Sequence, residues 1–169
     1  MSGNSDRNSV TAEHRAWATL VVAVLVTAAA ALIGTLATVP SIPGWYAQLA
    51  KPWWTPPDAL FGPVWTILYL MMAVAAWLVW RAAGWSGGAT AHALYGAQLA
   101  FNAAWSVLFF GLHLIGTGLI DIALLWLAIA ATIAAFTKHS RAAALLLVPY
   151  LLWVSYAATL NFGIWRLNP

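Results

Sequence analysis

The sequence predicts an all-α integral membrane protein, a bundle of five transmembrane helices. Its composition is one reason: 63% of the residues are hydrophobic and 7% are charged, with a mean hydropathy of +0.83. A soluble domain carries about 25% charged residues, so lipid is the expected solvent for most of the chain. The apolar residues are also gathered into five stretches, and a helix satisfies its own backbone polar groups in lipid.

Each apolar stretch is long enough to cross a bilayer as one helix. Each has roughly 22–24 residues, and about 20 are needed to span the hydrocarbon. Asp121 is the only acidic or basic residue inside these five stretches. The expected spans are Ala16–Val39, Ala59–Trp80, Ala91–Leu112, Ile115–Thr137 and Ala142–Trp165.

The first span follows a polar segment, residues 1–15, whose composition indicates a disordered tail. The apolar stretch after it is longer than the h-region of a signal peptide, which has about 7–15 residues. We therefore expect the stretch to be retained as a span, and the membrane domain to cover residues 16–169.

The second span is preceded by the long connection Pro40–Asp58, which is rich in Trp, Tyr and Pro and so does not have a disordered composition. Loops beyond about 12–15 residues are usually functional or disordered. Thr55 and Asp58 flank two prolines in the order of a capping box, which predicts a helix start. The aromatic residues fit either an interfacial anchor or the lid and wall of a binding site. Phe61, Trp65 and Tyr69 follow at spacings of four, so they share one helix face.

The third span has two different faces. We expect the face with large and polar residues to look into the bundle. The opposite face holds small residues, which let another helix approach closely, so a homodimer through the third helix is expected, with a chance stripe in an alanine-rich chain as the alternative. The inward face is Tyr95, Gln98, Asn102, Trp105 and Phe109, and the small face is Ala93, Gly96, Ala100 and Ala104.

Polar side chains and tryptophans also lie deep in the later spans. A central Asp costs about 2.5–3.5 kcal/mol to insert, and interhelical hydrogen bonds return about 0.6–2 kcal/mol. A deep indole needs a partner for its N–H, or a cavity. These groups either hydrogen-bond between helices or line a pocket that opens toward the long connection. They are Asn102, Asp121, Asn161, Trp126 and Trp153.

Several kinds of chemistry are excluded by what the chain lacks. It has no cysteine, and its four histidines are scattered without metal-ligand spacing, so we expect neither a metal site nor a catalytic thiolate. It has no phosphate loop, nucleophile elbow or paired carboxylates, which leaves no ordinary catalytic residue to name. No basic patch is dense enough for nucleic acid.

The distribution of positive charge predicts the orientation. With five spans, the N-terminus shares a side with the connections near residues 81–90 and 138–141, which carry Arg81, Lys138 and Arg141. We therefore expect a multi-pass protein with its N-terminus in the cytoplasm and the long connection outside.

Three tryptophan-rich segments resemble a known family. They are WYAQLAKPWWTPPDALFGPVWTILYLMM, AQLAFNAAWSVLFFG and VPYLLWVSYAATLNFGIWRLN. In order and spacing they resemble the TspO/MBR family, the tryptophan-rich sensory proteins that are similar to the mitochondrial translocator protein or peripheral-type benzodiazepine receptor. The resemblance runs from Ala16 to the C-terminus. It implies a five-helix bundle, often a homodimer, with a pocket beneath the first loop that binds porphyrins and haem-pathway tetrapyrroles.

The resemblance also implies the residues of that pocket. Porphyrin or haem would be a ligand and not a required cofactor. A tetrapyrrole is a flat π-system with carboxylate arms, and stacking on indole contributes about 0.5–1.5 kcal/mol per pair. Lys51 at the mouth is expected to meet a carboxylate. The ligand-binding positions implied by motif match are Tyr46, Trp53, Trp65, Asn102, Trp153 and Ala157.

The expected function is a membrane receptor or transporter for porphyrins and related hydrophobic ligands, in stress or tetrapyrrole regulation. Its expected partners are the ligand, membrane lipid and a second copy of the chain. Two alternatives stay open. One is a light-dependent porphyrin-degrading enzyme whose tryptophans supply electrons. The other is a structural membrane bundle whose polar residues only hold the helices together.

Overall fold

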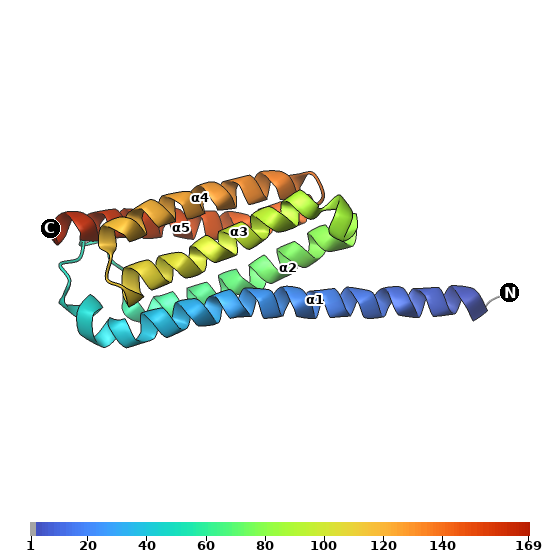
Figure 1. The fold of residues 1–169 in the computed structure, drawn as a ribbon, viewed down its shortest axis with the longest axis horizontal. Coiled ribbons are helices and arrows are strands. Elements are labelled where there is room, and N and C mark those ends of the chain that lie inside the picture. The colour runs from blue at the N-terminus through green and yellow to red at the C-terminus, as the bar shows by residue number, and fades with distance from the viewer. Residues whose placement is uncertain (1–2) are drawn as a thin grey trace.

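Five long helices run side by side and hold most of the chain (Figure 1). The computed structural model describes the backbone of residues 3–169, and the side chains from residue 13 onward. Four short 3₁₀ or π-helical turns, η1 (Val39–Ser41), η2 (Ile42–Tyr46), η3 (Asp58–Leu60) and η4 (Val107–Gly111), join or extend the long helices. The long helices are α1 (Gly3–Thr38), α2 (Phe61–Gly87), α3 (Ala89–Ser106), α4 (Ile115–Thr137) and α5 (Arg141–Leu167).

All five helical segments are long and apolar enough to cross a membrane. Within residues 3–169 these segments are Glu13–Tyr46, Asp58–Gly87, Ala89–Gly111, Ile115–Thr137 and Arg141–Leu167. Many large apolar side chains on the outer faces are exposed, as expected where the surrounding solvent is hydrocarbon. The predicted five-helix membrane bundle is therefore confirmed. Four of the expected spans lie entirely within one of these segments, and the third extends one residue beyond its segment, to Leu112.

The helix α1 is longer than the span it contains. Residues 1–2 lie outside the described part of the chain, and the backbone is helical from Gly3, where the sequence analysis expected a disordered tail over residues 1–15. The extra turns project beyond the rest of the bundle (Figure 1). They precede the apolar span in the same helix, and extending a formed helix adds a hydrogen bond per residue without a new nucleation cost.

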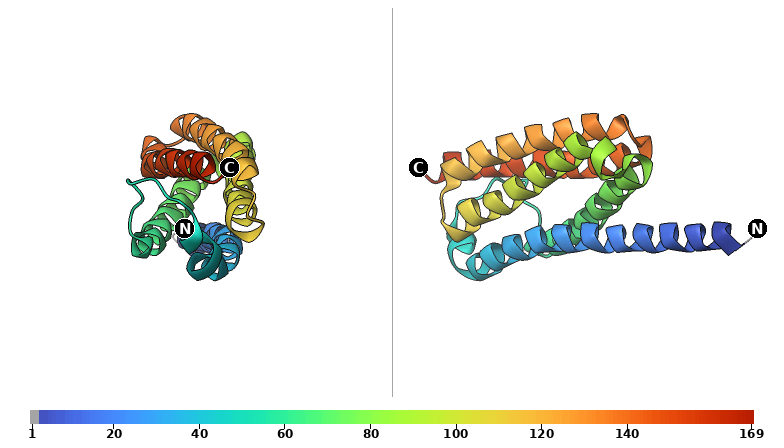
Figure 2. Two further views of the ribbon diagram at one scale, coloured as in Figure 1. Left: turned by 90° about the vertical axis from the view of Figure 1, so that its left-hand side faces the viewer. Right: turned by 45° about the vertical axis from the view of Figure 1, so that its right-hand side comes forward.

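The connections alternate between the two ends of the bundle (Figures 1 and 2). The corner between α2 and α3 and the turn between α4 and α5 lie at the end from which α1 starts. At that corner Gly84 has a φ of +65°, a conformation that glycine adopts without a steric penalty. The long connection, the turn between α3 and α4, and the C-terminus lie at the opposite end. Helix α5 packs against α4 and α2, and α1 packs against α2 and α3.

Hydrogen bonds made by side chains join the helices, some in the interior and some nearer the surface. Asn161 on α5 accepts a bond from Trp105 Nε1 at 3.1 Å and donates one to the carbonyl of Ile115 at 3.0 Å. It thereby links α3, α4 and α5. Trp126 on α4 donates to Ser155 Oγ on α5 at 2.8 Å. For Asn161 and Trp126, the interpretation as interhelical hydrogen-bond partners is therefore the correct one.

Hydrogen bonds hold the C-terminal half of the long connection against α5 and the residue that follows it. The side chain of Asn168 pairs with the peptide groups of Ala50: Ala50 N donates to Oδ1 at 3.1 Å, and Nδ2 donates to the Ala50 carbonyl at 3.0 Å. Tyr156 on α5 donates to the carbonyl of Trp54 at 2.6 Å. The segment is therefore an ordered cover over the end of the bundle.

The same segment packs into a notch on α5 at Gly163. The ring of Pro52 occupies the space that a side chain would need there. Thr55 folds back on this proline, with both its N–H (3.0 Å) and its hydroxyl (2.8 Å) bonded to the Pro52 carbonyl. The prediction that Thr55 caps the second helix was wrong: the helical backbone begins after Pro57 without a side-chain cap, because the Thr55 hydroxyl is used in this turn.

Candidate ligand-binding cavity

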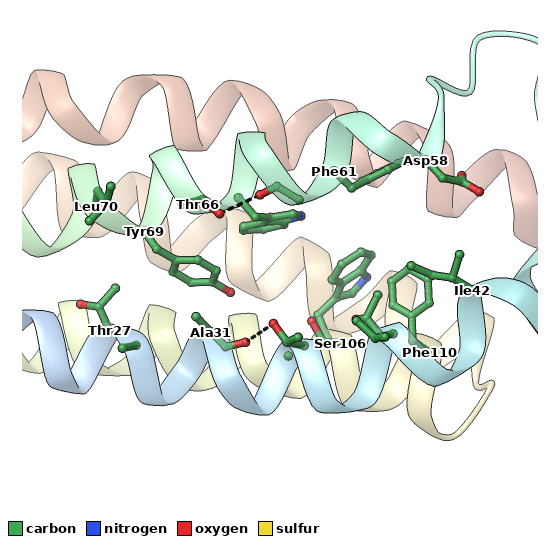
Figure 3. Close-up of a pocket in the computed structure, with 18 of the residues that line it drawn as sticks. Thr27, Ala31, Ile42, Asp58, Phe61, Thr66, Tyr69, Leu70, Ser106 and Phe110 are labelled. Carbon is green, nitrogen blue, oxygen red and sulfur yellow. Dashed lines mark hydrogen bonds between the residues drawn. The ribbon is translucent and has the colours of Figure 1, made fainter.

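A cavity of about 420 Å³ lies between α1 and α2, in the half of the bundle beneath the long connection (Figure 3). Helix α1 forms one side and α2 the other. Trp105 and Ser106 of α3, with Phe110 of η4, complete the lining. Small-molecule sites are usually concave, mostly apolar and about 300–1,000 Å³ in volume, and this cavity has those properties.

The wall formed by α2 is aromatic. Phe61, Trp65 and Tyr69 all line the cavity, so the prediction that they share one face is confirmed. The rings of Trp65 and Tyr69 lie 5.5 Å apart at 30°. Figure 3 shows Tyr69 projecting from α2 into the space opposite Thr27 and Ala31 of α1. The wall formed by α2 presents aromatic rings over about two helical turns, and the facing wall on α1 is mostly small side chains.

A chain of hydrogen bonds holds Tyr69 in place from behind. Tyr69 donates to Asn102 Oδ1 at 2.6 Å, and Asn102 Nδ2 donates to the hydroxyl of Tyr150 at 3.0 Å. Asn102 is 1% exposed and does not line the cavity. Of the two interpretations of Asn102, the geometry favours the interhelical one, and its effect on the site is to orient an aromatic ring of the wall.

Most hydroxyl groups of the lining are already hydrogen-bonded within the protein. Thr66 donates to the carbonyl of Gly62 at 2.9 Å and Thr35 to that of Ala31 at 2.8 Å (Figure 3). Thr27 shares a hydrogen bond of 2.5 Å with the hydroxyl of Tyr95. A ligand in the middle of the cavity therefore meets a surface that is effectively apolar.

The loop end of the cavity is formed by Tyr46 of η2 and Asp58 of η3. Tyr46 is buried, and Lys51 Nζ lies 4.4 Å above the centre of its ring. Such a cation–π contact is worth about 0.5–1 kcal/mol at an exposed site, so it holds the ammonium group beside the cavity. Lys51 is not itself part of the lining.

Two of the six positions implied by the resemblance, Tyr46 and Trp65, lie in this cavity, and Asn102 supports it. Trp53 points away from the bundle and is 90% exposed. Trp153 lines a second hollow, between α2 and α5, where it meets the edge of Phe61 at 5.9 Å. Ala157 is buried on α5 and lines neither hollow. Of the six positions, two therefore line the cavity, one supports its wall, and the other three lie outside it.

Part of the lining was missed by the sequence analysis. Helix α1 contributes Thr27, Ala31 and Gly34, and a Cβ at Gly34 would lie 3.1 Å from Ser106 Oγ. Residues three or four apart on a helix share a face, so the small side chains of the first span, at these spacings, are the signal that was available. Read together with the aromatic face of the second span, they indicate a space between the two helices.

Buried polar groups also lie outside the cavity lining. Gln98 is fully buried, its Nε2 lies 3.9 Å from the sulfur of Met72, and its Oε1 has no partner among the described residues. The same holds for Oδ2 of Asp121 and for Nε1 of Trp153. Nε1 of Trp126 has a partner, as predicted, whereas Nε1 of Trp153 is buried without one among the described residues, although the Trp153 side chain lines the second hollow.

The fold and the cavity define a class: a polytopic helical membrane protein with an internal, aromatic-walled cavity of the size of a small molecule. The TspO/MBR family model matches residues 21–166. The chain is 41% identical over 149 residues to a tryptophan-rich protein TspO of Archaeoglobus fulgidus, covering 88% of this chain and 96% of that protein. It is 49% identical over 127 residues to one from Chlorobaculum tepidum, with 74% and 80% covered. The human translocator protein is 45% identical over 129 residues, with 73% and 75% covered. The chain belongs to the TspO/MBR family.

Proposed function

We propose that this protein is a membrane receptor or transporter that binds a flat hydrophobic molecule of the porphyrin class between α1 and α2. The observation that carries the proposal is the aromatic wall of Phe61, Trp65 and Tyr69 along a cavity of ligand size. The names of the relatives, which include translocator protein and tryptophan-rich sensory protein, fit transport or sensing.

The shape of the cavity suits a planar guest. One face of a flat ring system would stack on Trp65 and Tyr69, and the other would lie on the small side chains of α1. Each aromatic pair contributes about 0.5–1.5 kcal/mol beyond the area it buries. The carboxylate arms of a tetrapyrrole would extend past Tyr46 toward Lys51, where the hydrocarbon ends.

Such a ligand would enter the cavity directly from the bilayer, between α1 and α2. Val24 and Ala28 on α1, and Thr66 and Leu70 on α2, line the cavity and are also exposed on the outer side of the bundle. A molecule dissolved in lipid therefore reaches the gap between the two helices without crossing the ordered cover formed by the long connection.

The test is a titration of the purified protein in lipid nanodiscs with protoporphyrin IX, followed by the shift of its Soret band. Trp65→Ala should weaken binding about 10- to 100-fold, because it removes stacking and buried area worth about 1.4–2.8 kcal/mol. Trp17→Ala is the matched control, since Trp17 is exposed at the far end of α1. Equal affinities for wild type, Trp65→Ala and Trp17→Ala would refute the proposal.

The remaining implied positions are tested in the same titration. Trp53→Ala should change affinity less than twofold if the exposed indole stays outside the site, and a larger loss would show that the ligand recruits it. Trp153→Phe keeps an aromatic side chain but replaces the indole with a smaller ring that lacks the unpaired N–H. A loss of affinity in that variant would mean that a ligand group accepts a hydrogen bond from the far side of α2.

We further propose that two copies of the chain associate through α3. Ala93, Gly96 and Ala100 are exposed, and a Cβ at Gly96 would meet nothing within 4 Å. The inward residues of α3 are buried, whereas three of the four residues of the small face are exposed and the fourth, Ala104, is half-buried. Close helix approach at small residues is the usual basis of association in lipid.

We also propose that the end from which α1 starts faces the cytoplasm. Arg81, Lys138 and Arg141 lie at that end, and Lys51 and Arg166 at the other. Because the chain has no cysteine, single cysteines at Ser86 and Trp53 report the orientation in intact cells. Labelling of Trp53→Cys, but not of Ser86→Cys, by an impermeant maleimide is expected, and the reverse pattern would invert the assignment.

A further inference from the structure

An acidic side chain at the mouth of the cavity affects which ligands the cavity can bind. Among the described residues that line the cavity, Asp58 is the only acidic or basic one. It stands in the first turn of η3, at the loop end, beyond Phe61 (Figure 3). Its carboxylate is directed toward that end, where a polar substituent of a bound ring system would emerge.

The carboxylate is free to meet a ligand. Within residues 13–169 it takes part in no salt bridge, and the η3 turn begins without a side-chain cap. Lys51, the cation of the same connection, is held 4.4 Å above the Tyr46 ring and is not part of the lining. Asp58 therefore has no ion-pair partner among residues 13–169.

The position of Asp58 also acts against an anionic ligand group. Asp58 is the acidic residue of the short turn η3, immediately before α2 begins at Phe61. A ligand carboxylate brought to the same point would face a like charge, whereas a cationic group would face the opposite one.

We propose that the mouth of the cavity selects flat aromatic ligands that carry a cationic group on the side facing Asp58. The proposal rests on the proposed function, because it assumes that the cavity between α1 and α2 is the binding site. For a tetrapyrrole, the same charge turns the carboxylate arms away from η3 and toward Lys51. The mouth would thus recognise a planar apolar molecule that presents a cationic group to Asp58, or one whose carboxylates lie on the side of Lys51.

Three acridines of nearly equal size test the charge preference. At pH 8, 9-aminoacridine is a cation, acridine is neutral and acridine-9-carboxylate is an anion. Each is titrated by its fluorescence into wild-type protein in nanodiscs of uncharged phosphatidylcholine. We expect the cation to bind about three- to fivefold more tightly than the neutral ring, the size of an exposed charge pair, and the anion, whose carboxylate must turn away from Asp58, to show no such gain. Raising the salt concentration should reduce the differences, because the mouth is exposed.

The decisive variant is Asp58→Asn, which keeps the shape of the side chain and removes its charge. It should abolish the preference for 9-aminoacridine and leave the affinity for acridine unchanged. Glu13→Gln is the matched control, because it removes a carboxylate at the N-terminal end of α1, far from the cavity mouth, and should preserve the order. An unchanged order in Asp58→Asn, or equal changes for all three ligands, would overturn the charge proposal.

Trp65→Ala separates failure of this inference from failure of the proposed function. If Trp65→Ala weakens all three acridines while Asp58→Asn leaves their order intact, the cavity is the site and only the charge inference is wrong. If Trp65→Ala changes none of them, or none binds saturably, the cavity is not the site and both proposals fail.

Discussion

Replacing Gly163 by alanine should release the long connection from α5. A Cβ built at Gly163 would overlap Cγ of Pro52, and it would lie 3.5 Å from both Pro52 Cβ and Trp54 Cζ2. The proline ring cannot rotate out of the way as a flexible side chain would. The backbone of the connection must therefore move, and the Ala50–Asn168 and Trp54–Tyr156 hydrogen bonds move with it.

The size of the effect follows from the packing. Inserting a methyl group into a well-packed contact costs about 1–3 kcal/mol. Alanine also has a higher helix propensity than glycine, by about 1 kcal/mol, but α5 is helical whether the connection is docked or not. That gain cancels in the docking equilibrium. The undocked population should therefore rise about 5- to 150-fold.

Amide hydrogen exchange measures this population directly. The N–H of Ala50 is bonded to Asn168 Oδ1 and that of Thr55 to the Pro52 carbonyl, so both are protected while the connection is docked. Local opening sets their exchange rate, and peptides that contain them should exchange faster in Gly163→Ala by the same factor.

The matched control for this experiment is Gly96→Ala on α3. It makes the same chemical change in a helix, but its Cβ meets nothing within 4 Å. Exchange in the connection should stay at the wild-type rate there. If Gly163→Ala exchanges no faster than Gly96→Ala, the contact between Pro52 and Gly163 does not hold the connection, and the reasoning above fails.

Three further predictions concern the bundle. Asn161→Leu should lower the free energy of unfolding in mixed detergent micelles by about 1–3 kcal/mol, because it leaves the buried N–H of Trp105 without a partner; an unchanged value would show that the amide is dispensable. Tyr69→Phe should cost about 0.6–1.7 kcal/mol in the same assay, the range for a hydrogen bond between membrane helices, and the loss should disappear when Asn102 is already alanine. Gly96→Cys, in a chain without native cysteine, should form a disulfide-linked dimer in nanodisc or membrane samples, whereas a cysteine on the outer face of α5 at Leu152 should not; equal crosslinking at both sites would speak against the α3 interface.

The sequence was sufficient for the helices and for the faces within a helix. Hydropathy is a local property, and a span of about 20 apolar residues has one stable form in lipid, so the five spans were located from the sequence. The helical period places residues three or four apart on one face. Phe61, Trp65 and Tyr69 were therefore grouped correctly, and the inward face of α3 was separated from its small face.

The tertiary structure decided how those faces meet. The period of a helix does not say how the helix is rotated relative to its neighbours, because that depends on packing between segments far apart in the chain. This is why Trp65 lies in the cavity, Trp53 is exposed, and Trp153 faces the other side of α2. It is also why Asn102 orients Tyr69 from behind and does not face a ligand, and why a proline of the long connection fits a glycine of α5. Local sequence determines which groups are available, and only long-range packing determines which of them share a space.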